Sequence, residues 1–172
     1  MSSQEFVDLP QPDQLAEREK EDGMGAYLMM FAAFAVGLPL PVVNLIAALI
    51  YYFINRKKSR FIRFHCLQSF LSQIPTTLLN WGLLYWVLQI YLFHNHTENH
   101  FFFAYVVLVI IANLIYVIFS IVAAVKARKG NFYYFIFFGP YAYKRVYSRL
   151  NPLQYNNEEK KAGGVRLNKP PY

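Results

Sequence analysis

The chain has very little cysteine and little charge, and each shortage excludes a class of protein. Cys66 is the one cysteine, so neither an internal disulfide nor a metal site with several cysteine ligands can form. Charged residues make up 16% and hydrophobic residues 56%, whereas soluble domains average about 25% and about 45–50%. This composition argues against an ordinary water-soluble globule, and the high hydrophobic content excludes an intrinsically disordered chain.

Charge is missing from whole stretches of the chain. Asp, Glu, Lys and Arg are absent from residues 23–55, 66–93, 99–125 and 130–143. A membrane hydrocarbon core is about 30 Å thick and is crossed by about 20 helical residues. Residues 74–93 and 101–125 meet that length, so both are predicted to be transmembrane helices.

The first uncharged stretch, residues 23–55, is too long for one straight span and short for two. Pro39 and Pro41 interrupt it, because proline lacks a backbone donor and disfavours helix in the residue before it. We favour two short helices, 24–37 and 42–55, folded as a hairpin. The alternative is a single kinked and strongly tilted span.

Two later elements also carry a proline. Pro75 lies inside a long element expected over 61–93, so a kink is predicted there. Tyrosine and phenylalanine dominate residues 131–143, a segment too short to cross a membrane but suited to its interface. We expect a helix over 131–149 lying in the cytoplasmic face, with a re-entrant dip broken at Pro140 as the alternative.

Lysine and arginine gather at the ends of the uncharged stretches and predict the orientation. Retained basic residues mark the cytoplasmic side of a membrane, and the loop 94–100 has none. The hairpin interpretation therefore puts both termini in the cytoplasm, whereas the single span puts the N-terminus outside. We expect the basic groups to contact anionic lipid headgroups, which accounts for the net charge of +7 without nucleic acid. They are Arg56, Lys57, Lys58, Arg60, Arg63, Lys126, Arg128, Lys129, Lys144, Arg145 and Arg149.

Both ends of the chain are expected to be mobile. Residues 1–22 are polar and hold seven of the ten acidic residues, which suggests an extended arm rather than a secretory signal. Residues 151–172 contain two glycines and three prolines, and we expect a mobile tail unless a partner orders it.

The third helical segment has a polar face. Its members follow one another at spacings that keep them on one side of a helix, while Gln68 flanks that face and two asparagines occupy the middle of other segments. We favour a stripe that packs helices together, with a hydrated path or a docking groove as the alternative. The residues are His65, Gln68, Ser69, Ser72, Gln73, Thr76, Asn80, Asn44 and Asn113.

The sequence offers few candidates for chemistry. His94, His96 and His100 could hold a metal ion, although we expect no metal and no cofactor, because loops become histidine-rich by chance. Cys66 on an apolar helix flank is expected to be inert. Motifs of nucleotide-binding, serine-hydrolase and zinc-protease sites are missing, so we expect a protein that is not an enzyme.

One stretch resembles a known family. The order Pro39 to Asn44, then Phe-Ile-Arg-Phe-His-Cys-Leu-Gln over 61–68, then Lys-Ala-Arg-Lys-Gly over 126–130 resembles the Tic-twenty-like small integral membrane proteins. Most bacterial members of that family have no assigned activity. The resemblance implies a four-helical membrane subunit of a larger assembly, with protein translocation as its process.

The sequence thus predicts an all-α polytopic membrane helix bundle with four helical segments and a C-terminal aromatic interfacial helix. The expected function is a non-enzymatic accessory or scaffold subunit of a protein-export complex, and the alternative is a small oligomeric channel or carrier that uses the polar face. Expected partners are membrane lipid and other integral membrane subunits, in the bacterial inner membrane rather than a plastid envelope. The membrane domain is 23–150, with segments near 24–37, 42–55, 61–93, 100–127 and 131–149.

Overall fold

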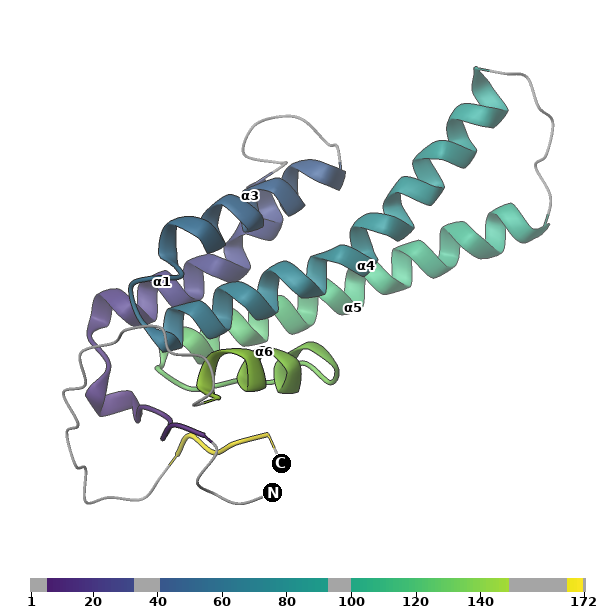
Figure 1. Ribbon diagram of the computed structural model, residues 1–172. Coiled ribbons are helices and arrows are strands. Elements are labelled where there is room, and N and C mark those ends of the chain that lie inside the picture. Colours follow the sequence, from purple (N-terminus) through teal and green to yellow (C-terminus); the bar gives the residue numbers. More distant parts are fainter. Residues whose placement is uncertain (1–5, 33–40, 93–99, 149–166, 172) are drawn as a thin grey trace.

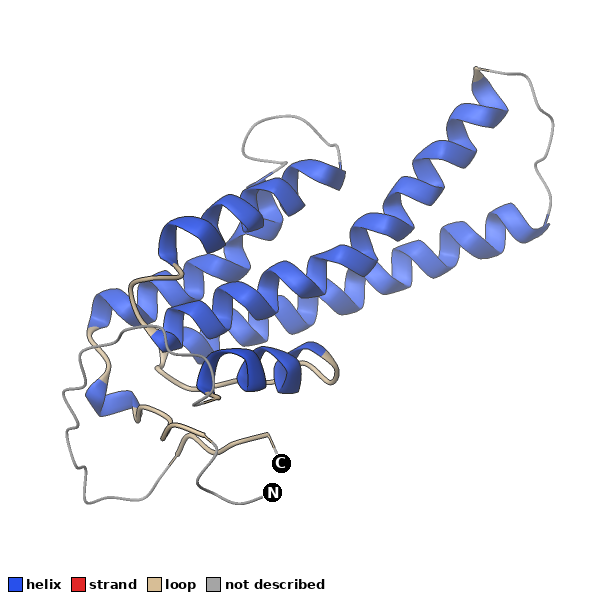
Figure 2. Ribbon diagram, viewed as in Figure 1, coloured by secondary structure: helices blue, strands red, loops and turns tan. Residues whose placement is uncertain are grey.

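The computed structural model describes residues 6–32, 41–92, 100–148 and 167–171 (Figure 1). Within these ranges the secondary structure is helical, and the expected all-α class is confirmed (Figure 2). One isolated antiparallel bridge joins Phe6 to Ser148. The elements in chain order are the short 3-10 helix η1 (Pro12–Gln14), α1 (Glu17–Leu28), the 3-10 helix η2 (Met29–Phe31), α3 (Pro41–Asn55), α4 (Arg60–Tyr91), α5 (His100–Arg128) and α6 (Phe138–Tyr147).

Helix α4 is the centre of the bundle and contacts α1, α3, α5 and α6. The first half of α4 is covered by these neighbours, while its second half and the start of α5 extend beyond them as a long pair (Figure 1). Helix α4 begins cleanly because the Ser59 hydroxyl accepts a hydrogen bond from the Ile62 amide at 3.2 Å. Helix α5 ends at Arg128, and the chain turns away at Gly130, whose φ of 75° is the left-handed conformation that glycine adopts most readily.

Two separate helices that contact each other, α1 and α3, share the first uncharged stretch in the described residues, as the hairpin interpretation expects, while most of the segment between them lies outside the described part. Pro41 is the first residue of α3, a position where proline is tolerated, and Pro39 lies outside the described residues. The expected start at residue 24 is wrong, because α1 begins at Glu17 inside the acidic arm. Acidic side chains in a first turn complement the helix dipole, and a search for apolar runs cannot detect such a start.

The two terminal segments expected to be mobile lie together. The Val7 amide donates to the Tyr147 carbonyl at 2.9 Å, joining the N-terminal segment to the end of α6. Near the C-terminus, Asn168 is buried, and its side chain donates to the carbonyls of Pro10 and Gly130 at 2.7 and 2.9 Å. The described residues of both tails therefore pack on the bundle, and residues 149–166 lie outside the described part.

The expected helix over 131–149 is corrected to α6, which starts at Phe138. The preceding residues are not helical, because the Tyr133 carbonyl and the Phe135 amide bond to the side chain of Gln68 instead of to a helix. Helix α6 also packs against α4 through buried residues, including Tyr143 and Tyr147, so it is part of the core rather than only a surface helix.

Among the described residues, α5 is the one helix both long and apolar enough to cross a membrane. Only 17% of its most apolar window is buried inside the bundle, unlike the core helix of a soluble protein. The matching prediction for 74–93 is not confirmed, although α4 covers most of that range as helix. Thr76, Thr77 and Asn80 lower the apolarity of that part of α4.

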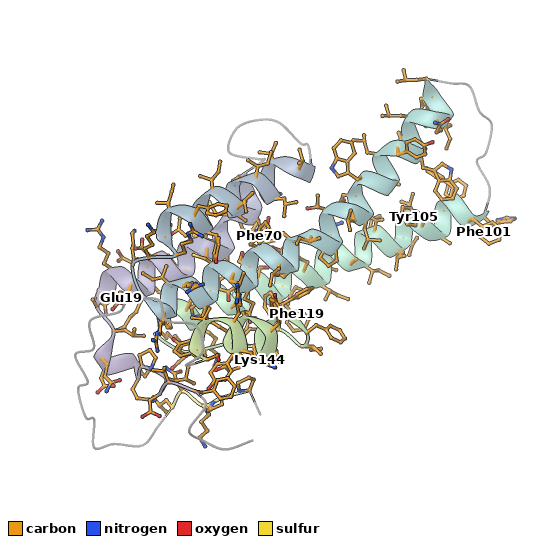
Figure 3. The ribbon with its side chains drawn as sticks, viewed as in Figure 1. Glu19, Phe70, Phe101, Tyr105, Phe119 and Lys144 are labelled. Carbon is orange, nitrogen blue, oxygen red and sulfur yellow. The ribbon has the colours of Figure 1, made fainter. Side chains whose placement is uncertain are left out.

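Pro75 lies inside α4, and the helix continues through it. Figure 1 shows α4 changing direction along its length and then diverging from α5, as the predicted kink requires. The far part of the pair is joined by Tyr105, whose hydroxyl reaches from α5 to the Leu79 carbonyl at 2.9 Å (Figure 3).

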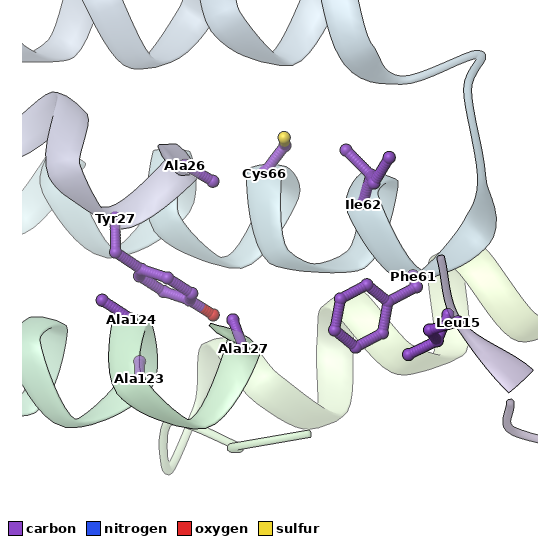
Figure 4. Packing of buried hydrophobic residues seen from close by; sticks show 9 residues of the cluster. All are labelled: Leu15, Ala26, Tyr27, Phe61, Ile62, Cys66, Ala123, Ala124 and Ala127. Carbon is purple, nitrogen blue, oxygen red and sulfur yellow. The ribbon is translucent and has the colours of Figure 1, made fainter. Parts of the chain in front are cut away.

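The apolar core joins α1, α4 and α5. Figure 4 shows small residues of α5 packed beneath the ring of Tyr27. Alanines at these positions allow the two helices to approach closely, because their side chains take little space. The cluster consists of Leu15, Ala26, Tyr27, Phe61, Ile62, Cys66, Ala123, Ala124 and Ala127.

Candidate functional site

The polar face of α4 is divided by the fold into a buried cluster and an open cleft. His65, Gln68 and Ser69 are at most 1% exposed and are surrounded by other elements. Thr76 and Asn80, about one and two helical turns after Gln73, are only partly buried. The two parts have different surroundings and are described separately.

In the buried cluster, Gln68 is the residue that joins the most elements. Its Nε2 donates to the Tyr27 hydroxyl on α1 at 2.8 Å and to the Tyr133 carbonyl at 2.9 Å. Its Oε1 accepts from the Phe135 amide at 3.3 Å. One side chain thus ties α1 and the segment before α6 to α4, which is the role expected of a packing stripe.

His65 lies inside a box of aromatic rings. The rings of Phe61 and Phe64 approach it edge-on, with centroids at 4.4 and 5.1 Å, and Phe132 stacks on it at 5.6 Å. Its Nδ1 is 2.9 Å from the Tyr27 hydroxyl, and its Nε2 has no hydrogen-bond partner. The arrangement is that of a core histidine held by packing.

Ser69 and Ser72 complete the buried cluster. The Ser69 hydroxyl donates to the Ala26 carbonyl of α1 at 2.7 Å, and the Ser72 hydroxyl donates to the Ser69 carbonyl at 2.8 Å. The hydrogen bonds of these residues are made inside the bundle, so the structure favours the packing interpretation for this half of the polar face.

The second half of the polar face lines a cleft of about 300 Å³ between η2, α3, α4 and α5. Asn80 and Asn113 join across it through two reciprocal side-chain hydrogen bonds of 3.0 and 3.1 Å. Each asparagine also donates to a carbonyl of its own helix, at Thr76 and at Val109. The described lining consists of Met30, Phe31, Asn44, Gln73, Thr76, Thr77, Asn80, Asn113, Tyr116 and Val117.

Sequence reasoning found most of the polar residues of α4 but not the polar residues of other helices that lie beside them. Tyr27, Tyr116 and Ser120 sit in apolar runs, and nothing in their spacing separates them from ordinary membrane-facing or core residues. Their proximity to the polar face of α4 follows only from how α1 and α5 pack on it.

The basic residues gather at one end of the bundle, but some of them pair within the chain. Arg128 bonds to Glu17 at 2.6 Å and to Glu21 at 3.3 Å, and Lys58 bonds to Asp22 at 2.8 Å. The Arg128 guanidinium, followed by the Lys20 ammonium, lowers the pKa of Glu17 from 4.5 to about 2. The acidic start of α1 thus takes part of the charge that the sequence analysis assigned to lipid headgroups.

The other basic residues lie at the same end or outside the described part. The Arg56 guanidinium sits over the ring of Phe53 at 4.7 Å, while Lys144 and Arg145 are exposed on α6. Arg149 is not among the described residues. Basic residues of the α3–α4 turn and of the last turn of α5 are close in space, since both sets pair with α1.

The histidine-rich loop falls mostly outside the described residues, including His94 and His96. His100 is the first residue of α5 and is exposed. In the part of the chain that is described, no group of three or more His, Cys, Asp or Glu side chains could hold a metal ion.

Comparison with known proteins corrects the family assignment. The chain matches no curated protein and no solved structure. A family model does match, over residues 21–141, and its description is magnetosome magnetite crystal formation protein family, MamF/MmsF. That match overturns the resemblance to the Tic-twenty-like proteins and, with it, the support for protein translocation, because both rested on short motifs within the same residues. Since the match covers more than half of its length, the chain belongs to the MamF/MmsF magnetosome magnetite crystal formation family.

Proposed function

We propose that this protein is a non-enzymatic integral membrane protein of the magnetosome, where it acts as an accessory subunit in magnetite crystal formation. Family membership supports the process and the membrane. The observation that carries the integral membrane assignment is the exposed apolar surface of α5, which would be unstable in water. That surface includes Phe103, Val107, Ile110, Ile111, Leu114, Ile115, Ile118 and Val125, each at least 49% exposed.

The proposed topology has α5 and the second half of α4 crossing the bilayer as a pair. The beginning of α1, the turn between α3 and α4 and the end of α5 lie at one end of the bundle (Figure 1). The described terminal segments also lie there, since Asn168 bonds to Pro10 and to Gly130 after α5, which favours termini on the same, cytoplasmic side. Ile136 and Phe137, each 80% exposed in the turn before α6, suit contact with lipid.

An accessory role fits the chemistry of the described side chains. His65 and Cys66 are at most 2% exposed, so neither is available to a substrate in solution. The polar side chains of the buried cluster are used to hold helices together. We therefore propose that the protein acts through contacts with lipid and with other magnetosome membrane proteins.

The membrane assignment is tested with a single charge on α5. In Ile115→Lys, a lysine replaces a side chain that is 49% exposed near the middle of the helix. A charge at the centre of a membrane helix costs about 2.5–3.5 kcal/mol, so the variant should be lost from the membrane fraction after alkaline extraction. Phe101→Lys is the matched control: it lies at the helix end, where lysine reaches the interface, and should remain membrane-bound.

If the unmodified chain and both lysine variants were all recovered in the soluble fraction, a membrane-spanning α5 would be contradicted. The process is tested separately in cells that form magnetosomes, by deleting the protein and measuring crystal size and number by electron microscopy. We expect altered crystals inside intact magnetosome membranes, and the wild-type chain should restore them. Unchanged crystals would exclude the proposed role.

A further inference from the structure

The segment that leads into α6 lies alongside the apolar part of α5. The rings of Tyr133 and Phe135 pack against the ring of Phe119 on α5, with centroids at 6.4 and 6.3 Å. Lys126, the first charged residue after the apolar stretch of α5, follows Phe119 by seven residues, which is about 10 Å of helix. The headgroup layer is about 5–8 Å thick on each side of a bilayer. With Lys126 at the headgroups, the chain at Phe135 lies at the level of the acyl chains.

The turn after Phe135 presents its most apolar side chains outward. The Gly139 amide donates to the Phe135 carbonyl at 2.8 Å, which closes the turn. Ile136 and Phe137 stand on this turn, and each is 80% exposed. Transfer out of water is favourable in proportion to the apolar area removed, so both side chains gain from lipid acyl chains around them.

The exposed face of α6 continues from this turn. Phe137 has helical backbone angles at the start of α6, so Phe137, Tyr141 and Lys144 follow at spacings of four and three residues and share one face. All three are exposed. Helix α6 leads back toward the end of α5, since Tyr147 packs on Phe132 with ring centroids at 5.8 Å (Figure 1). The face thus passes from an apolar ring to a ring with a polar tip and then to a cation, the order found from acyl chains to headgroups.

The charge around this face has one sign. Residues 131–148 include two charged residues, Lys144 and Arg145, and both are positive. Lys169 is also exposed, and its carbonyl accepts a hydrogen bond from the Tyr134 hydroxyl at 2.9 Å, which places it beside the same segment. A lysine ammonium binds phosphate as a point charge. Cations near the membrane surface favour lipids with a net negative charge over zwitterionic ones.

We propose that Phe137, Tyr141 and Lys144, named here the α6 stripe, form a binding site for an anionic phospholipid of the cytoplasmic leaflet. The lipid phosphate contacts Lys144, the Tyr141 ring lies at the level of the glycerol esters, and the acyl chains run beside Ile136 and Phe137. The inference rests on the proposed membrane-spanning α5, and adds the lipid class and the residues that select it.

The test uses the full chain in nanodiscs that contain equal amounts of phosphatidylglycerol and phosphatidylcholine. Phe137→Trp, in a chain with Trp81→Phe and Trp86→Phe, supplies a single fluorophore on the stripe. Bromine on the acyl chains of one lipid at a time quenches a tryptophan that it contacts. We expect a preference of about fivefold for the brominated phosphatidylglycerol, the effect of one lysine near the surface. Equal quenching by the two lipids would overturn the lipid class.

A pair of lysine variants assigns the preference to the stripe. Lys144→Gln removes the cation and should reduce the preference from about fivefold to less than about twofold. Lys57→Gln is the matched control, because it removes the same charge from the exposed turn between α3 and α4, and it should leave the preference unchanged. A preference that persists in Lys144→Gln, or that falls equally in both variants, contradicts a site on α6.

A second fluorophore separates this proposal from the membrane assignment. Trp81, on the second half of α4, is 43% exposed and is the remaining tryptophan in Trp86→Phe. Quenching of Trp81 by brominated lipid, with the tryptophan at position 137 reached only by aqueous iodide, would contradict the α6 stripe alone. If brominated lipid quenched neither tryptophan, the membrane assignment would fail together with the stripe.

Discussion

The amide of Gln68 and the hydroxyl of Tyr27 are 2.8 Å apart, and this hydrogen bond links α4 to α1, two of the three helices that build the apolar core. Tyr27 arrives from α1 and is 1% exposed, while Gln68 is fully buried on α4. The same amide holds the segment that leads to α6. The packing of three elements therefore depends on one glutamine.

Replacing Gln68 with leucine should destabilise the protein strongly. The change leaves the Tyr27 hydroxyl buried, and the partly buried Tyr133 carbonyl and Phe135 amide, without their partner, and the unfolding free energy should fall by about 2–4 kcal/mol. The reporter is the thiol of the buried Cys66, which reacts with a thiol reagent only when the protein unfolds. Its reactivity is measured as the concentration of a denaturing detergent is raised. Gln89→Leu is the control and should change stability by less than about 0.5 kcal/mol. Equal stability of the two variants contradicts the role given to Gln68.

Asn80 and Asn113 should behave as a coupled pair. Asn80→Leu removes both reciprocal hydrogen bonds and leaves the Asn113 amide with its backbone bond alone. The double change to leucine should cost less than the sum of the single changes, with a coupling energy of about 0.6–1.7 kcal/mol, as for polar pairs in membrane helices. A thiol-reactivity measurement of all four proteins gives this energy, and additive costs would show that the pair does not couple.

The carboxyl of Glu17 should titrate far below an ordinary glutamate. Because the ion pair with Arg128 lowers its pKa from 4.5 to about 2, its contribution to stability is complete above pH 4.5 and is lost as the pH falls toward 2. NMR titration of the Glu17 carboxyl carbon measures this directly. In Arg128→Gln the pKa should rise toward 4.5, whereas Arg18→Gln removes the same charge from α1 and should leave it low. An unshifted carboxyl in the wild-type chain would mean that the pair does not form.

Gly139 should not tolerate a side chain. A Cβ there would lie 2.7 Å from the Tyr134 Cα, which belongs to the backbone, and 3.0 Å from the Gln68 Oε1. Gly139→Ala should therefore lower stability by about 1–3 kcal/mol, as overpacked positions do. Lys144→Ala on the exposed face of the same helix is the comparison and should be nearly neutral. Wild-type stability of Gly139→Ala would mean that α6 is not held against α4 in this way.

The sequence by itself determined the class of structure, because it depends on features that lie within single segments. These features are long uncharged runs, prolines and polar residues spaced at the 3.6-residue period of a helix. The helical hairpin broken near Pro41, the apolar helix through 101–125 and the polar face of α4 follow from such local patterns. The start of α1 at Glu17 could not be read from a local pattern, because Arg128, which pairs with Glu17, is more than a hundred residues away in the sequence. The short motifs also led to the wrong family. They include only a few positions, whereas the family model matches 121 residues, from 21 to 141.

Only the tertiary structure decided what each polar residue does. His65, Gln68, Gln73 and Asn80 are alike in sequence terms, as uncharged polar residues on one helical face. Packing of α1 and the segment before α6 encloses the first two and satisfies most of their hydrogen bonds, whereas the partial cover beyond Gln73 leaves a cleft. The physical reason is that burial and hydrogen-bond satisfaction depend on neighbours distant in the chain, and periodicity carries information about one helix at a time.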